Sequence, residues 1–147
     1  MITGAALLEM FEGEWDLSRR IDEENAVMIG HARFTREGSD VLRYREEGLL
    51  TLRNGQTIRC SRRYRFVAYP DSLLIEFDDG PDQGKKFVEI RFTGNPDGLM
   101  MGLDDHHCGQ DLYTVEYRLS PPGCYETHVT VSGPQKAYRA VTRYQKS

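Results

Sequence analysis

The sequence predicts an all-β protein: an antiparallel up-and-down β-barrel of about 8–10 strands, preceded by a short N-terminal helix. Hydrophobic and polar residues alternate with period two through most of the chain, the pattern of strands buried on one face. Turn signals, of which Asn54-Gly55 is the strongest, separate these segments at hairpin distances. Closure into a barrel would leave no strand edge unpaired. An open curved sheet or a β-sandwich is the alternative.

Residues 3–11 are the only segment with a clear helical pattern. Thr3 is a suitable N-cap, alanines and leucines favour the helix, and Gly13 lies just beyond its end. The period-two segments then predict a series of strands. Their expected ranges are 14–22, 26–35, 41–53, 56–69, 73–77, 86–92, 99–107, 112–119, 125–131 and 137–145.

Length and composition exclude several classes of protein. With 147 residues, of which 39% are hydrophobic and 29% charged, the chain is expected to form a single domain over residues 1–147. A net charge of -4 gives no reason to expect a nucleic-acid partner. No apolar run is long enough to cross a bilayer, and the first residues do not resemble a signal peptide. We therefore expect a cytoplasmic protein with no membrane partner.

The three cysteines, Cys60, Cys108 and Cys124, lack the spacing of a disulfide framework or a structural zinc site. The glycine-containing segments fit turns, and none has the pattern of a phosphate-binding loop. No cofactor is expected from these signals.

Polar residues lie on the predicted inner face of two long strands. Tyr44 and Glu46 share the inner face of residues 41–53, and Arg62 and Tyr64 share that of residues 56–69. Burying a lone charge is costly, so Glu46 and Arg62 are expected to pair with each other, with solvent in a cavity, or with a ligand. A self-contained internal ion pair is the purely structural alternative.

A second polar stretch covers residues 104–117. Adjacent residues of a strand face opposite sides, so His106 and His107 cannot easily bind one metal ion. We expect His107 to gather with Asp111 and Tyr113 at the barrel mouth, for hydrogen bonding or for proton transfer. Haem ligation by His107 or His128 is a further alternative, and no spacing here is diagnostic of a metal site.

Gly13-Glu14-Trp15, directly after a short helix, resembles the Gly-x-Trp signature of lipocalins and related calycin barrels. In those barrels the tryptophan closes one end and packs against an arginine from the last strand. The resemblance therefore implies that Trp15 meets Arg143, with Arg139 as the other candidate.

Three blocks, GEWDLSRRI, HHCGQDLYTVEY and GPQKAYRAVTRY, also resemble, in this order, a family of small lipocalin-like domains of unknown function. That resemblance implies that the residues to inspect first are His107, Asp111, Tyr113, Tyr138, Arg139 and Arg143.

These observations favour a small-molecule binding protein whose ligand is partly apolar and either acidic or a hydrogen-bond acceptor. Arg62, with Arg19 as a second candidate, would supply the charge. The expected lining and rim comprise Tyr44, Glu46, Tyr64, His107, Asp111, Tyr113 and Tyr117.

The alternatives are an enzyme, such as an isomerase, cyclase or hydrolase that uses His107 as acid or base, and a purely structural interaction domain. A homodimer through a strand edge or the helix is compatible with either.

Overall fold

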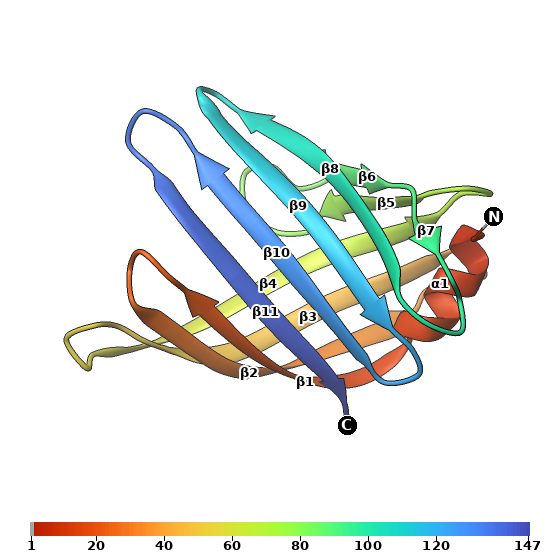
Figure 1. Ribbon diagram of the computed structural model, residues 1–147, viewed down its shortest axis with the longest axis horizontal. Coiled ribbons are helices and arrows are strands. Elements are labelled where there is room, and N and C mark those ends of the chain that lie inside the picture. Colours follow the sequence, from red (N-terminus) through yellow and green to blue (C-terminus); the bar gives the residue numbers. More distant parts are fainter. Residues whose placement is uncertain (1) are drawn as a thin grey trace.

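The computed structural model describes residues 2–147, which form one antiparallel sheet of eleven strands and one helix (Figure 1). The prediction of an all-β barrel-like fold with a short N-terminal helix is confirmed. The elements are α1 (Gly4–Phe11), β1 (Gly13–Ile21), β2 (Ala26–Arg36), β3 (Val41–Thr51), β4 (Thr57–Ala68), β5 (Leu73–Phe77), β6 (Lys86–Ile90), β7 (Thr93–Gly94), β8 (Met100–Cys108), β9 (Asp111–Ser120), β10 (Cys124–Ser132) and β11 (Ala137–Lys146). Sequence periodicity predicts every strand except β7, which is only two residues long.

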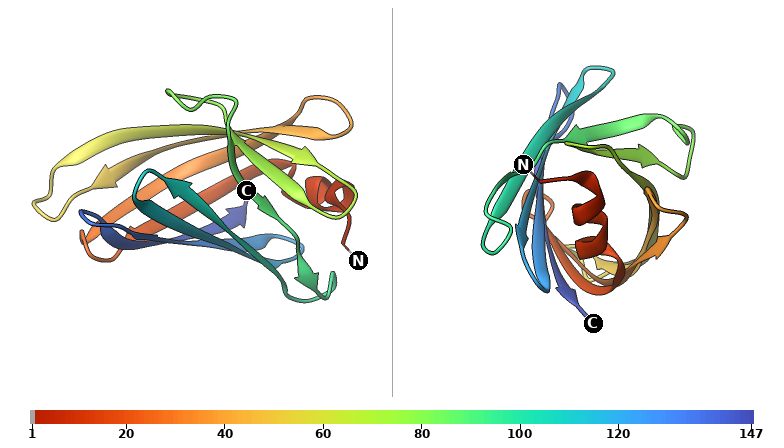
Figure 2. Two further views of the ribbon diagram at one scale, coloured as in Figure 1. Left: turned by 90° about the horizontal axis from the view of Figure 1, so that it is seen from above. Right: turned by 90° about the vertical axis from the view of Figure 1, so that its right-hand side faces the viewer.

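The sheet curls into a barrel that is hydrogen-bonded on all sides but one (Figure 2). Its strand order is β6-β5-β4-β3-β2-β1-β11-β10-β9-β8-β7, so β1 joins the two halves by pairing with β11. No ladder links β6 to β8 among the described residues, but the two strands touch. The Glu89 amide donates to Asp104 Oδ2 at 2.8 Å, and Gly102 packs so closely on Ile90 that a Cβ there would collide. We call this contact the β6–β8 seam.

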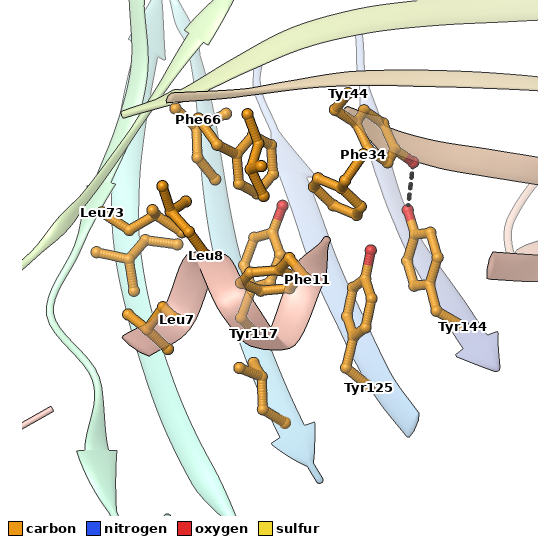
Figure 3. Close-up of a cluster of buried hydrophobic side chains, with 14 of the residues drawn as sticks. Leu7, Leu8, Phe11, Phe34, Tyr44, Phe66, Leu73, Tyr117, Tyr125 and Tyr144 are labelled. Atoms are coloured by element: carbon orange, nitrogen blue, oxygen red, sulfur yellow. Dashed lines mark hydrogen bonds between the residues drawn. The ribbon is translucent and has the colours of Figure 1, made fainter. Parts of the chain in front are cut away.

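Helix α1 covers one end of the barrel (Figures 2 and 3). The Thr3 side chain accepts a hydrogen bond from the Ala6 amide at 3.2 Å, so the expected N-cap is confirmed. Leu7, Leu8 and Phe11 are buried against the inner faces of the strands. The Phe11 ring lies 5.1–6.1 Å, between centroids, from four aromatic rings, those of Phe34, Phe66, Tyr117 and Tyr125.

Trp15 closes the same end, but its basic neighbour is not the expected one. The indole Nε1 donates to the Phe11 carbonyl at 2.8 Å, and Lys146 Nζ lies 4.6 Å from the ring centroid. Arg143 is instead exposed and pairs with Glu126 at 3.2 Å. The expected Trp15–Arg143 contact is therefore wrong. In the β1–β11 register, Lys146 lies opposite Trp15. Arg143 is three residues from Lys146 on the same strand, an odd number, so Arg143 points to the other face of the sheet, the outside.

Gly13 makes the turn from α1 into β1. Its φ of 121° lies in the region that residues with a side chain rarely adopt. Glycine is therefore required where the chain leaves the helix and enters the strand that carries Trp15.

The contacts of Phe11 predict that Phe11→Ala destabilises the fold by about 3–5 kcal/mol, because it leaves a cavity among four rings. Urea unfolding followed by Trp15 fluorescence would measure the loss. Glu9→Ala, an exposed position of the same helix, is the matched control and should change stability by less than about 0.5 kcal/mol. Equal losses in the two variants would contradict the role of Phe11 as the plug of this end.

Candidate functional site

The end of the barrel opposite α1 is where inward-facing side chains keep access to solvent. The turns β1–β2, β3–β4, β8–β9 and β10–β11 border this open end (Figure 2). Toward α1 the inward residues are fully buried, whereas near the turns they are partly exposed. These partly exposed inward residues are Ile21, Leu50, Ile58, Cys60, Arg62, Tyr64, Phe77, Phe87, His106, Tyr113, Val129 and Tyr138. The candidate site is this inner surface.

A buried ion pair forms the base of the site. Arg19 Nη1 and Nη2 donate to the two carboxylate oxygens of Glu46 at 2.8 and 3.0 Å, a bidentate arrangement. Arg19 Nε donates to Thr142 Oγ1 at 2.7 Å, and the Tyr44 hydroxyl donates to Glu46 at 2.6 Å. The side chains of Arg19 and Glu46 are 22% and 5% exposed. Glu46 was expected to pair with Arg62, with solvent or with a ligand. Its closest partner is instead Arg19.

Two glycines make room for this pair. Arg19 of β1 lies opposite Met28 of β2. The next residue on the same face of β2 is Gly30, which lies opposite Gly48 of β3. Glu46 is the next inward residue of β3 after Gly48. The side chain of Arg19 thus reaches Glu46 across a row that carries no side chains. A Cβ at Gly48 would come within 2.6 Å of Met28 Cε, and the Met28 sulfur itself contacts Arg19 at 3.6 Å.

The ion pair keeps both groups charged. Burial alone would raise the pKa of Glu46, but the hydrogen bonds and the charge of Arg19 outweigh it and hold that pKa below its ordinary value. Burial likewise opposes charge on Arg19, but the bonds to Glu46 raise the pKa of Arg19 well above its ordinary value. Glu46 is therefore a carboxylate at neutral pH, with its charge already matched.

Buried tyrosines lie inside the barrel, and one of them, Tyr44, bonds to Glu46 of the pair; Figure 3 shows Tyr44 and Tyr144 joined at their hydroxyls, with Tyr117 and Tyr125 beside them. The Tyr125 and Tyr144 rings stack with centroids 4.1 Å apart, and Tyr117 stacks on Tyr125 at 6.1 Å. The hydroxyls of Tyr44 and Tyr144 are 2.9 Å apart. Burial raises the pKa of Tyr44, Tyr117 and Tyr125 well above the ordinary value, and that of Tyr144 to about 12. At neutral pH these hydroxyls therefore keep their protons and can donate hydrogen bonds.

Arg62 is an inward-facing cation whose ion-pair contact is long. It lies directly opposite Glu46 in the β3–β4 register, but its Nη1 donates to the Tyr64 hydroxyl at 3.3 Å. The nearest ion-pair contact of Arg62 is with Asp79, 3.9 Å from its Nε, and the side chain is 48% exposed. The expected Glu46–Arg62 ion pair does not form, because Arg19 occupies both oxygens of Glu46 and leaves Arg62 free to face the open end.

The expected position of His107 at the barrel mouth is wrong. His107 is exposed and lies opposite Leu112, on the outer face of β8, so it does not gather with Asp111 and Tyr113. Its neighbour His106 points inward, with its ring 6.1 Å from that of Tyr113. The alternation of the two histidines is as expected, but the sequence carries no signal for which one faces inward, since that depends on the register of β8 with β9.

Asp111 and Tyr113 do come together at the rim of the open end. Lys136 Nζ from the β10–β11 turn lies 3.7 Å from Asp111 Oδ2 and 3.5 Å from the Tyr113 hydroxyl. Lys136 therefore balances the charge of Asp111. His128, considered as a haem ligand, lies on the outer face between Glu126 and Arg139, with which it makes contacts of 2.9 and 2.7 Å.

Phe87 is a residue of the site that the sequence pattern misses. Val88 and Ile90 face inward, so strict alternation would turn Phe87 outward. A register shift places Val88 opposite Ile75 but Lys86 opposite Glu76, which leaves Phe87 as an extra residue in a β-bulge. Its ring consequently lies inside, 5.6 Å from Tyr64 and 5.0 Å from Phe77.

Other kinds of site find less support. Residues 2–147 contain no cluster of three or more potential metal-binding side chains, and none of their helices is long and apolar enough for a bilayer. A hollow of about 590 Å³ is lined by residues of β1, β2, β9, β10 and β11 and by Leu99, and the lining includes Asp16, Arg118 and Arg143 from the outer face of the sheet. Arg118 and Arg143 there are already paired, with Glu116 at 2.8 Å and Glu126 at 3.2 Å. We therefore place the candidate site inside the open end.

Comparison with known proteins agrees with this architecture. Residues 11–146 match the model of the family of unknown function DUF6314. The chain belongs to this family. No protein of curated function matches the sequence significantly.

Several solved barrels resemble the structure across nearly the whole chain. The S-type phycobiliprotein lyase CPES from Guillardia theta aligns with a TM-score of 0.63 at 11% identity, over 99% of this chain and 93% of that one. A de novo designed fluorescence-activating β-barrel aligns with a TM-score of 0.53 at 10% identity over the full length of both chains. The barrel EF1p2_mFAP2b bound to DFHBI gives 0.51 and 12% over 98% of each chain. At such identities the likeness shows the fold alone.

The ion pair predicts that Glu46→Gln costs about 3 kcal/mol of stability at pH 7, because Arg19 is left buried without its counter-charge. The pKa of Glu46 is lowered in the folded state, so its contribution is present above the ordinary value of 4.5 and is lost as the pH falls through the folded-state pKa. The stability gap between the native protein and the variant should therefore shrink in acid.

Urea unfolding at pH 7, 5 and 3.5 would measure this gap. Glu47→Gln is the matched control, because Glu47 is the exposed neighbour on the outer face and pairs with Arg45 at the surface. Its effect should stay below about 1 kcal/mol. A gap for Glu46→Gln that is independent of pH would contradict the assignment of Glu46 as a buried carboxylate.

Proposed function

We propose that this protein binds a small, partly apolar molecule at the open end of its barrel, and that the ligand is acidic or a hydrogen-bond acceptor. The observation that carries the proposal is Arg62: an inward-facing, half-exposed guanidinium whose ion-pair contact, with Asp79, is 3.9 Å long. A charge in that position is expected to find a partner, and a ligand that enters the open end would supply one.

The balance of charge inside the barrel supports an acceptor rather than a cation. Glu46 is neutralised by Arg19, and Lys136 offsets Asp111 at the rim. Burial raises the pKa of Tyr64 and Tyr117, so their hydroxyls stay protonated and can donate. The groups left to bind a ligand are the Arg62 guanidinium and the tyrosine hydroxyls, which lie among apolar side chains. Many small-molecule sites have this composition.

The comparisons support small-molecule binding only in general. EF1p2_mFAP2b is described as bound to DFHBI, which demonstrates that a barrel of related shape can hold a small molecule. We further infer that this barrel is of the lipocalin-like kind. The support is Gly13-Glu14-Trp15 after a capping helix, with a basic side chain of the last strand over the indole ring.

We place the protein in the cytoplasm, a location that the three free cysteines support. An enzyme that uses His107 inside the barrel is not part of this proposal, since His107 lies on the outer face.

Two fluorescent probes that differ only by a sulfonate test the charge role of Arg62. They are 8-anilinonaphthalene-1-sulfonate, an anion, and N-phenyl-1-naphthylamine, its neutral counterpart. Arg62→Met should weaken binding of the anion about tenfold or more, because a charge-assisted contact is lost. Binding of the neutral probe should change by less than about twofold. Fluorescence titration gives both dissociation constants.

Arg63→Met is the matched control, because Arg63 is the next residue on the same strand and points outward. It should leave both affinities unchanged. Equal losses of the two probes in Arg62→Met, or no binding of the anion to the native protein, would refute the proposal.

A further inference from the structure

We infer that the acid bound at the open end is planar and aromatic, with its anionic group on Arg62 and its ring against a wall of aromatic side chains. This inference rests on the proposed function and adds the chemical class of the ligand. The aromatic wall consists of five inward, partly exposed residues: Tyr64, Phe77, Phe87, His106 and Tyr113.

The rings of the wall form one continuous group. Tyr64 and Phe87 stack at 5.6 Å with an interplanar angle of 10°, and Phe77 lies 5.0 Å from Phe87. His106 meets Phe87 edge to face at 5.3 Å, and Tyr113 continues the series at 6.1 Å. All five residues are only partly buried, so the group is not sealed off from solvent. Another ring could extend the group in the offset or edge-to-face geometries that aromatic pairs prefer.

The cation lies at one end of this wall. The Arg62 guanidinium carbon is 5.8 Å from the centroid of the Tyr64 ring, and Arg62 also donates to the Tyr64 hydroxyl. Tyr64 in turn stacks on Phe87. A single molecule with an acidic group attached to a flat ring system would therefore contact Arg62 and the aromatic rings together.

The rest of the inner surface is different in kind. Its residues on β1, β3, β4 and β10 are mainly aliphatic, namely Ile21, Leu50, Ile58 and Val129 with Cys60, and β11 adds one aromatic residue, Tyr138. Aromatic side chains are thus concentrated on the side next to Arg62. A fatty acid would need only apolar area, which both sides offer, whereas a flat ring gains the additional aromatic contacts on the side of the wall.

The backbone has a feature that places Phe87 in the wall. Without the extra residue in β6, Phe87 would point away from the interior, and Tyr64 would lose its stacking partner. A β-bulge commonly redirects a side chain next to a site. The competing explanation is that the rings serve only to fill the β6–β8 seam, which His106 also spans through its contacts with Phe77 and Phe87.

A pair of acids of equal charge separates the two explanations. The probes are 2-naphthoate and decahydro-2-naphthoate, which share the carbon skeleton and the carboxylate but differ in aromaticity and flatness. Isothermal titration calorimetry with the full chain should show that 2-naphthoate binds at least about fivefold more tightly. Phe87→Leu should abolish this preference, while the affinity for the saturated acid changes by less than about twofold.

Tyr69→Leu, which removes an exposed aromatic residue outside the wall, is the control and should preserve the preference. The comparison of the two acids on the native protein requires no variant, so it stands even if Phe87→Leu does not fold. Equal affinities, tighter binding of the saturated acid, or binding of neither acid would overturn the inference. If the anionic fluorescent probe still depends on Arg62 in that case, the proposed function survives and only the aromatic class of ligand is wrong.

Discussion

The ion pair between Arg19 and Glu46 is the interaction on which the interior of this barrel depends. It joins β1 to β3 through two hydrogen bonds, and β1 to β11 through Thr142, so it ties together both halves of the sheet. A buried pair of this kind stabilises a fold only when its remaining hydrogen-bonding groups are satisfied. Here the Tyr44 hydroxyl supplies a further bond to Glu46, and no buried polar side-chain atom of residues 2–147 lacks a partner.

The same pair decides the electrostatics of the open end. Both carboxylate oxygens of Glu46 bind Arg19, and Glu46 forms no ion pair with Arg62 in residues 2–147, although Arg62 lies directly opposite it across the ladder. The tyrosines nearby remain neutral because their burial raises the pKa of each hydroxyl. The interior therefore combines an apolar, plugged end under α1 with a polar layer and, above it, the Arg62 guanidinium beside aromatic rings, with a long ion-pair contact to Asp79.

The two ends of the barrel have different physical properties as a result. At the α1 end, Phe11 and Trp15 are packed on all sides, and loss of either would open a cavity. Along one side of the barrel, the β6–β8 seam has no hydrogen-bonded ladder in residues 2–147 and is joined by the Glu89–Asp104 contact, by Gly102 against Ile90 and, toward the open end, by the rings around His106. The candidate site thus lies next to the side of the barrel that side-chain contacts close.

Local pattern was enough to predict the helix with its Thr3 cap, ten of the strands, and the inward faces of Tyr44, Glu46, Arg62 and Tyr64. The reason is that period-two alternation and turn chemistry depend only on neighbouring residues.

Pairing across the barrel was decided by the tertiary structure alone. The partner of Glu46 depends on a diagonal across two glycines in different strands. The neighbour of Trp15 and the inward histidine depend on strand register, and the inward turn of Phe87 depends on a bulge. Alternation states that successive residues face opposite sides, but register and curvature, which arise from contacts far apart in the sequence, determine which side is the interior and what each side chain meets there.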